Sequence, residues 1–416
     1  MINARTITAF QENVPDDIFL SDLEYIKECL SFIAPRTLRV SSISKSLLNC
    51  KDFKSREDIW GVSKKIDINR LDCTETVEKI VTDIGENKKS FYSVNIDEKL
   101  NVNSSVIFEI TSLVRKVSLL GKKDGHSNFQ LGIGFNIPEY TPYFPYSFSL
   151  KENYSKKTKV SIGLEIVNFI KSLIVKNSRL SLNDLSLLIK TSVEQQLAIT
   201  QKNILELFSK HNSPIEFVGF DISLAPFPYL HGEASVVELV EALGNVGRSR
   251  SKIKFKFGDP GTQFTHTFFT NILKLIQQEH KIKTVGFCSA MYSVLEDNLL
   301  ASYYSSKRID YKNLMLLAST CGCGIDMLPL NCQVKDEEIY GYFLDTFCLS
   351  SKLKKPLGVR LLIDNNKNAN SPTNYEDIFF SNLCLANSRN GPHFLKLPTQ
   401  VNDKINFTTM SKNELF

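Results

Sequence analysis

Alternating apolar and polar residues predict β-strands at several points along the chain. The stretch ARTITAF within residues 1–10 alternates in this way, and so does TLRVSS at 37–42. Other segments are apolar almost throughout, which is typical of strands buried on both faces of a sheet. The remaining predicted strands are at 91–96, 129–135, 215–223 (IEFVGFDIS), 284–288 (TVGFC) and 356–363 (PLGVRLLI).

Apolar residues three or four positions apart predict amphipathic helices between these strands. Val106, Ile110 and Leu113, for example, would lie on one face of a helix. The predicted helices are at 16–33, 56–66, 74–84, 103–120, 161–175, 182–207, 233–243, 262–279 and 336–351. Repeated alternation of strands and helices favours an α/β fold. Since no clear break divides the sequence, we expect one α/β domain at 1–390 and a tail at 391–416.

Residues 284–330 combine structural and chemical signals more densely than any other stretch. An apolar run ends at Cys288, and the acidic pair Glu296 and Asp297 follows it. After a predicted helix, a second run with two cysteines ends at Asp326. This order predicts a strand, a helical crossover and another strand. Because ligands of α/β proteins usually bind at the carboxyl ends of strands, we expect the functional site here.

The bulk composition excludes some classes of partner. The chain has 416 residues, of which 42% are hydrophobic and 23% charged, and its net charge of +5 is too small to indicate a nucleic-acid partner. Cations on every second residue from Arg248 to Lys256 are more simply explained as a solvated edge strand. No apolar run approaches the length of about 18 residues that a membrane-spanning helix needs.

Cysteine usage points to a reducing compartment. The nine cysteines show no spacing typical of a disulfide framework, and the N-terminus has no apolar signal segment. We therefore expect a cytoplasmic protein with free thiols. A homodimer is the expected oligomer, because two-fold dimers are the commonest assembly of soluble chains.

The sharpest local motif is Cys321-Gly-Cys323-Gly. In an extended segment both thiols would face the same side, and the glycines would let a ligand approach closely. A thiol there would be a nucleophile or redox group if its pKa were lowered. The alternative is a pair of inert buried thiols, and the same alternative holds for Cys288. Structural zinc is disfavoured, because zinc sites need more ligands at set spacing.

Charged residues near the predicted strand ends are further candidates. Arg360 lies in a segment that should be buried, so it should either pair with a carboxylate, which we favour, or bind an anionic ligand. Asp221 and Asp326 each follow a buried run and need partners or solvent. Glu296 and Asp297 would either complement a helix dipole or act as acid or base.

Several segments, in chain order, resemble a family known as domain-of-unknown-function family 711. They are ARTITAF (4–10), TPYFPYSFSL (141–150), GFDISLAPFP (219–228), GFCSAMYSVLED (286–297), CGCGIDMLPL (321–330) and KPLGVRLL (355–362). The resemblance extends over roughly residues 2–390. It implies a ten-stranded α/β barrel similar to that of pyruvate formate-lyase and other glycyl-radical enzymes. It implies no particular reaction or cofactor.

Several candidate residues occupy positions of the family's motifs. They are Asp221, Ser223, Glu296, Asp297, Cys321, Asp326 and Arg360. Lys367 is similarly placed to a lysine of the family, although two asparagines precede it here. Ser149 stands where relatives have histidine, Ser289 replaces a glycine and Cys323 replaces a threonine. Because no Arg-Val-x-Gly-Tyr segment is found near the C-terminus, glycyl-radical chemistry is disfavoured.

These observations support two hypotheses. In the first, the chain is an enzyme that binds a small anionic metabolite inside the barrel. Its thiol would be Cys321, its proton carrier Asp221 or Glu296, and its anion clamp Arg360 or Lys367. The other expected binding residues are Ser223, Cys288, Asp297 and Asp326. In the second hypothesis the chain is a non-catalytic relative that serves as a binding or assembly module.

Overall fold

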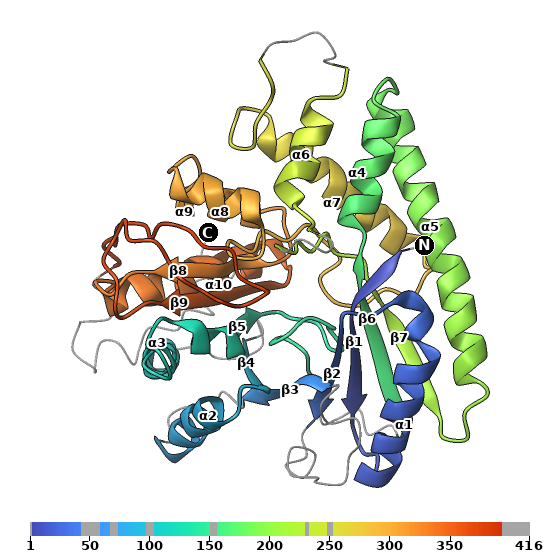
Figure 1. The fold of residues 1–416 in the computed structure, drawn as a ribbon, viewed down its shortest axis with the longest axis horizontal. Coiled ribbons are helices and arrows are strands. Elements are labelled where there is room, and N and C mark those ends of the chain that lie inside the picture. The colour runs from blue at the N-terminus through green and yellow to red at the C-terminus, as the bar shows by residue number, and fades with distance from the viewer. Residues whose placement is uncertain are drawn as a thin grey trace. The chain divides into compact units, whose positions relative to one another are not determined.

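The computed structural model describes residues 2–42, 59–66, 74–96, 104–149, 156–228, 233–247 and 253–392. These residues form a mixed α/β fold with a nine-stranded sheet that is not closed (Figure 1). None of the described helices is long and apolar enough to cross a membrane. The chain divides into two compact units, each assembled from three separate segments. The first unit contains Met1–Lys65, Pro138–Ala225 and Val236–Ala290, and the second contains Ile66–Ile137, Pro226–Ser235 and Met291–Phe416.

The strands of the first unit follow the order β7-β6-β1-β2-β3. Strand β1 is parallel to β2 and antiparallel to β6, while β2 pairs in parallel with β3 and β6 with β7. Nearly every residue of β1, β2 and β6 is buried, as expected for a sheet covered on both faces. The bounds are β1 Asn3–Gln11, β2 Thr37–Ser42, β3 Ile59–Ile66, β6 Thr158–Glu165 and β7 Ile215–Asp221.

Helices of the first unit bury one apolar stripe each. In α5 the stripe includes Leu185, Ile189 and Val193, and the Ser181 hydroxyl caps the helix by accepting from the Asp184 N–H. Helix α5 packs against β7 and lies beside α4 and α7 (Figure 1). The bounds are α1 Asp16–Cys29, α4 Val167–Lys176, α5 Leu182–Phe208, α6 Val236–Gly244 and α7 Thr262–Gln278, with a short 3-10 helix at Ser31–Ile33.

A loop at 138–149 lies against the strands of the first unit. Three strand hydroxyls donate to its backbone carbonyls: Thr8 to Pro142 at 2.8 Å, Ser41 to Ser147 at 3.1 Å and Ser63 to Pro145 at 2.8 Å. Its aromatic residues, including Tyr143 and Phe144, are buried. These residues therefore form an ordered loop that covers the strands, whereas 150–155 lie outside the described residues.

In the second unit the strand order is β4-β5-β9-β8. Strands β4 and β5 are parallel, β5 and β9 antiparallel, and β9 and β8 parallel. The strands are β4 Ser90–Ile96, β5 Leu131–Phe135, β8 Gly324–Leu330 and β9 Leu357–Ile363. The helices are α2 Thr74–Glu86, α3 Ser104–Ser118, α8 Asn298–Ser305, α9 Tyr311–Ala318 and α10 Asp336–Leu353, with a 3-10 helix at His126–Gln130.

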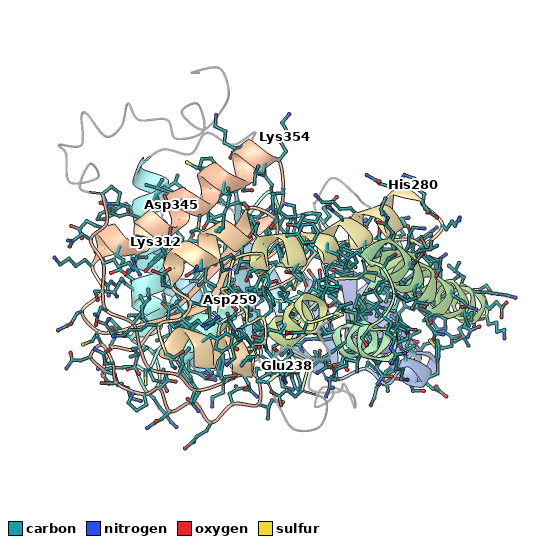
Figure 2. All side chains as sticks on the ribbon, turned by 90° about the horizontal axis from the view of Figure 1, so that it is seen from above. Glu238, Asp259, His280, Lys312, Asp345 and Lys354 are labelled. Atoms are coloured by element: carbon teal, nitrogen blue, oxygen red, sulfur yellow. The ribbon has the colours of Figure 1, made fainter. Side chains whose placement is uncertain are left out.

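The outer faces of α9 and α10 carry charge. Lys312, Asp345 and Lys354 are exposed and project away from the ribbon (Figure 2). The inner face of α10 instead buries apolar residues such as Phe343 and Phe347. This division agrees with the amphipathic pattern predicted for 336–351.

One predicted helix is wrong and another begins too early. Residues 59–66 form β3 rather than part of a helix, and the predicted helix at 161–175 is a helix only in α4 from Val167, because residues up to Glu165 belong to β6. In both places the backbone finds hydrogen-bond partners in strands distant along the chain, and this pairing overrides the local periodicity. Of the basic stretch, 253–256 is not a strand and 248–252 lie outside the described residues.

The predicted strand at 284–288 is irregular. It makes only single bridges, from Thr284 to Phe220 and, slightly further on, from Ala290 to Leu224. Positive φ angles at Gly286 (84°) and Cys288 (44°) interrupt the extended conformation. The predicted tail begins at 391, and its residues from 393 lie outside the described residues.

Candidate functional site

In the first unit, Asp221 ends β7 and is fully buried. Its Oδ1 accepts hydrogen bonds from the Ser223 N–H at 2.9 Å, the Ser223 hydroxyl at 2.5 Å and the Cys288 N–H at 3.0 Å. Its Oδ2 accepts from the Phe287 N–H at 2.8 Å. Both carboxylate oxygens are therefore engaged, and the side chain ties the end of β7 to residues 286–288.

The backbone beside the Asp221 carboxylate leaves room only for glycine at position 286. A Cβ atom on Gly286 would lie 2.2 Å from Asp221 Oδ2, and φ there is +84°, so glycine is required twice over. The Ser223 hydroxyl accepts from the Ser289 N–H at 3.1 Å while it donates to Asp221. We refer to Asp221, Ser223, Gly286, Phe287 and Cys288 as the Asp221 cluster.

Burial dominates the electrostatics of the Asp221 cluster. It raises the pKa of Asp221 to about 6, although four hydrogen bonds stabilise the carboxylate and oppose the shift. Burial, together with the nearby Asp221 carboxylate, raises the pKa of Cys288 well above its ordinary value. Both effects favour the protonated form of the Cys288 thiol, which is the less reactive one.

Three residues beside this cluster were not among the predicted site residues. The Tyr143 hydroxyl is buried and has no hydrogen-bond partner among the described residues. Burial and Asp221 raise its pKa, while Arg5 and Arg39 oppose the shift. Both arginines are only 5% exposed, and Arg5 sits at a β-bulge, which re-aims side chains. An arginine inside a buried strand is the signal that singled out Arg360, and it would also have identified Arg5 and Arg39.

In the second unit, Cys321 and Cys323 follow α9 and precede β8. The Cys321 N–H bonds to the Leu317 carbonyl at 2.8 Å, at the end of that helix. The pair therefore lies at the amino end of β8, and the expectation of a carboxyl-end position is wrong for these two thiols. Gly324 has φ of +74°, and a Cβ there would lie 2.3 Å from the Gly358 carbonyl oxygen. This close approach holds the start of β8 against β9.

The two thiols interact with each other. The hydrogen bond from the Cys323 thiol lowers the pKa of Cys321 despite burial, and the Lys355 ammonium adds to the effect. Burial raises the pKa of Cys323, whose sulfur also accepts from the Tyr292 N–H at 3.0 Å. Within this pair Cys323 is the donor and Cys321 the acceptor. The side chains are deeply buried, with Cys321 1% and Cys323 5% exposed.

Arg360 on β9 pairs with Asp326 on the adjacent β8. The Nε–Oδ1 distance is 2.5 Å and the Nη2–Oδ2 distance 2.7 Å, a bidentate geometry. The favoured prediction of an internal Arg–carboxylate pair is thus confirmed. Glu296 lies further off, with its Oε1 3.8 Å from Arg360 Nη2. We refer to Cys321, Cys323, Tyr292, Asp326, Arg360 and Glu296 as the Cys321 cluster.

The other predicted residues of the second unit lie in structural positions. Asp297 caps α8, since its Oδ1 accepts from the N–H groups of Leu299 and Leu300 and from the Ser235 hydroxyl. Lys367 donates to the Pro372 carbonyl at 2.7 Å in a surface loop. The structure therefore brings Cys321, Asp326, Arg360 and Glu296 into one cluster and places Asp221, Ser223 and Cys288 in another.

Within the described residues no group of three or more His, Cys, Asp or Glu side chains could hold a metal ion. The described cysteines are free thiols, namely Cys29, Cys288, Cys321, Cys323, Cys332, Cys348 and Cys384.

Comparison with known proteins supports the resemblance noted in the sequence. The family described as "Uncharacterised ACR (DUF711)" matches residues 62–375. A UPF0210 protein of Sulfurisphaera tokodaii is 25% identical over 242 residues, which are 57% of this chain and 50% of that protein. A UPF0210 protein of Pyrobaculum arsenaticum is 29% identical over 148 residues, or 36% of this chain and 31% of that protein. The matched stretches thus span half or less of these relatives. Because the family match covers well over half of the sequence, the chain belongs to the DUF711 family of uncharacterised proteins.

Proposed function

We propose that the chain is an enzyme that acts on a small anionic metabolite through the thiol of Cys321. The observation that carries this proposal is the thiol pair, in which Cys323 donates to the Cys321 sulfur and lowers its pKa. A thiolate at neutral pH is the reactive form of cysteine. An inert core cysteine would show the opposite shift, as Cys288 does.

Neighbouring groups suit the remaining roles. Glu296, whose Oε1 lies 3.8 Å from Arg360 Nη2, is the carboxylate that we assign as acid or base. Asp221, by contrast, has both oxygens engaged, and we assign it a positioning role. Lys355 beside the thiol supplies a positive charge that would attract an anion.

The proposal is tested by the reactivity of Cys321 in the folded protein. Alkylation by iodoacetamide, followed peptide by peptide with mass spectrometry from pH 5 to 9, should show Cys321 reacting with a midpoint below that of Cys348. A thermal-shift panel of anionic metabolites should then yield a ligand, since saturation at about 100 times Kd adds roughly 2.7 kcal/mol of stability. Turnover of that ligand should vanish in Cys321→Ala. An enzyme that turns over its ligand without Cys321 would contradict the assigned role.

A second candidate function is a non-catalytic binding or assembly module. It is supported by the burial of the Cys321 cluster. Cys321 is almost fully buried, and the Arg360 guanidinium is already paired with Asp326. If Cys321 resists alkylation until the protein unfolds, this second function is favoured. Sedimentation analysis would then test the expected homodimer.

We also propose that residues 284–294 are a tenth strand, as a barrel requires. The support comes from two hydrogen bonds made by this segment. The Val285 N–H donates to the Phe220 carbonyl of β7 at 2.9 Å, and the Val294 N–H donates to the Asp326 carbonyl of β8 at 3.0 Å. Slow amide exchange at both positions would support the proposal, and rapid exchange at both would contradict it.

A further inference from the structure

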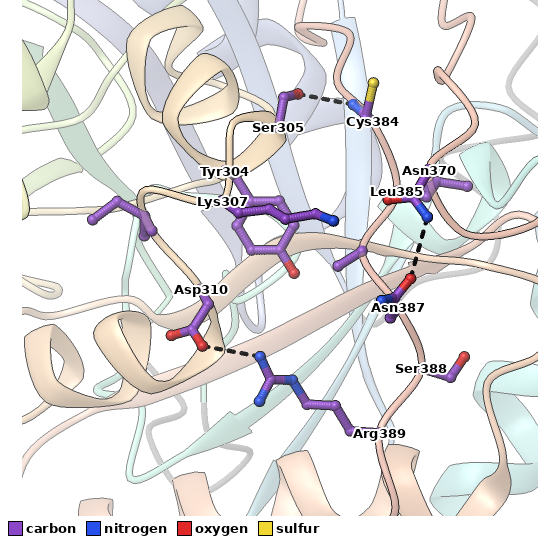
Figure 3. A pocket seen from close by; sticks show the side chains of 12 residues that line it. Tyr304, Ser305, Lys307, Asp310, Asn370, Cys384, Leu385, Asn387, Ser388 and Arg389 are labelled. Atoms are coloured by element: carbon purple, nitrogen blue, oxygen red, sulfur yellow. Dashed lines mark hydrogen bonds and ion pairs between the residues drawn. The ribbon is translucent and has the colours of Figure 1, made fainter.

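A polar pocket opens on the second unit, and its lining includes no residue of the Cys321 cluster (Figure 3). Its volume is about 280 Å³. This is slightly below the range of drug-sized sites, roughly 300 to 1,000 Å³, and is suited to a small metabolite. The lining comes from the end of α8 and the turn that follows it, and from the segment 384–389 with Asn370.

One wall of the pocket is held by backbone pairing. The Asn370 N–H donates to the Leu385 carbonyl at 2.8 Å, and the Leu385 N–H donates to the Ser371 carbonyl at 3.0 Å. Pro372 and Cys384 form an antiparallel bridge in the same ladder. A wall fixed before binding lowers the entropy lost when a ligand is ordered in the site.

Positive charge exceeds negative charge in the lining. Lys307 and Arg389 are the cations and Asp310 the single acid. Arg389 Nη2 lies 3.0 Å from Asp310 Oδ2, so these two charges form a pair at the edge of the pocket. The Lys307 ammonium extends across the pocket and forms no ion pair or hydrogen bond within the described part of the chain. The excess of one cation favours an anionic ligand.

Two hydroxyl groups line the pocket together with the Lys307 ammonium. The Tyr304 ring is buried, its hydroxyl points into the pocket, and that hydroxyl has no hydrogen-bond partner among the residues the structure describes. Burial raises the pKa of Tyr304, so the group remains a donor at neutral pH. Ser305 Oγ accepts from the Cys384 N–H at 2.8 Å, which leaves its own hydrogen to donate to a ligand. An ammonium and two hydroxyls are the donor set that an oxyanion group needs.

The backbone of Lys307 supplies an independent reason to connect this lysine with a ligand. Its φ is +59°, in the left-handed region after the end of α8, where glycine is usually found. A side chain in this conformation costs on the order of 1 kcal/mol, and such strain is concentrated at functional sites. Lys354 adopts the same conformation after α10, with φ of +49°, but does not line this pocket.

From this geometry we infer that the pocket binds a small organic anion through its carboxylate or phosphate group. Lys307, Tyr304 and Ser305 hold the oxyanion, and the amide side chains of Asn370 and Asn387 face the polar remainder of the ligand. Arg389, held by its ion pair with Asp310, borders the anion. This site is independent of the chemistry proposed for Cys321.

Exposed Cys384 in the pocket lining offers a direct measurement. Its alkylation rate in the full-length folded protein is followed by mass spectrometry with inorganic phosphate, malonate or chloride at equal ionic strength. Exposed Cys348, which does not line the pocket, is the internal reference. We expect phosphate or malonate to slow alkylation of Cys384 at least threefold and to leave Cys348 unchanged. The anion that protects identifies the group that the site prefers.

Matched variants separate binding from folding. Lys307→Gly relieves the left-handed strain and removes the cation, so protection should disappear while the melting temperature stays equal or rises. Lys354→Gly makes the same change of charge and backbone outside the pocket, and protection should remain. Tyr304→Phe should lower the affinity for the protecting anion about tenfold or more. Protection that persists in Lys307→Gly, equal protection of Cys348, or no protection by either anion would overturn the inference.

Discussion

The Asp221 cluster and the Cys321 cluster are both buried and both centre on an ionisable group, yet they use that group in opposite ways. Asp221 accepts four hydrogen bonds, three of them from backbone N–H groups, and its pKa is raised. The thiol of Cys323 has the largest lowering effect on the pKa of Cys321, and the Lys355 ammonium and the N–H groups of Gly324 and Cys323 add to it. A carboxylate held mainly by backbone N–H groups serves the fold, whereas a thiol whose main donor is a second thiol retains capacity for chemistry.

The difference teaches that burial and position at a strand end do not by themselves mark a reactive residue. Ser223 and Cys288 share the Asp221 cluster and are likewise engaged or protonated. In the Cys321 cluster, the strongest pair, Arg360 with Asp326, is structural, and Glu296 lies 3.8 Å from the same guanidinium. The donors around a group, rather than its residue type, separate the two roles.

Removal of the Asp221 carboxylate should have the largest effect. In Asp221→Ala three buried N–H groups lose their acceptor, at about 1–3 kcal/mol each, so the free energy of unfolding should fall by on the order of 5 kcal/mol. Urea denaturation measures the loss. Asp221→Asn keeps one acceptor oxygen and should lose less. If Asp221→Ala lost under 1 kcal/mol, Asp221 would not be the clamp described.

Arg360→Ala should destabilise the second unit by about 3–5 kcal/mol, because it leaves the Asp326 carboxylate buried without its counter-charge. The same denaturation measurement applies. The double variant Arg360→Met with Asp326→Leu removes both charges and should recover most of the loss. If the double variant were as unstable as the single one, packing rather than charge would account for the effect.

The two clusters should change the free energy of unfolding in opposite directions as the pH rises. The pKa of Asp221 is about 6 in the folded chain against 3.8 ordinarily, so between these values the folded state binds more protons. Its contribution should therefore fall as pH rises from 4 to 6, by on the order of 3 kcal/mol. The pKa of Cys321 is lowered by folding, so its contribution should rise with pH until the unfolded thiol also ionises.

Thermal denaturation across this pH range checks both signs. The difference between the natural chain and Asp221→Asn should depend on pH only on the acidic side. The difference from Cys321→Ser should depend on pH only on the alkaline side. If the stability difference depended on pH in the same way in both comparisons, the two groups would have similar environments.

The smallest effect concerns the thiol donor. Cys323→Ala removes the hydrogen bond to the Cys321 sulfur, so the thiol pKa should return toward about 8.5 and alkylation at pH 7 should slow by about tenfold. Cys323→Ser retains a donor and should slow alkylation less. An unchanged rate in Cys323→Ala would assign the low pKa to Lys355 and the backbone N–H groups of Cys323 and Gly324 instead.

Much of the element order followed from the sequence, because strong periodicity predicts elements such as α5 and β9 without tertiary information. β3 and β6 were missed because their pairing partners lie far along the chain. For the site, the position of Arg360 in a buried strand predicted a pair with a carboxylate, and Asp326 is that partner. The left-handed turn at Gly286, which aims backbone donors at Asp221, leaves no periodic signal and could not be predicted.

The interleaving of the two units governs how the chain can be made. Strand β1 leaves the ribosome early, yet its antiparallel partner β6 starts only at Thr158, and the first unit is complete only at Ala290. At about 5–20 residues per second, β1 waits on the order of ten seconds for that partner. No single cut yields an intact unit, since each draws on three segments. The nascent N-terminal strands therefore carry an exposed, apolar edge until β6 has been made, which is the condition under which chaperones are recruited.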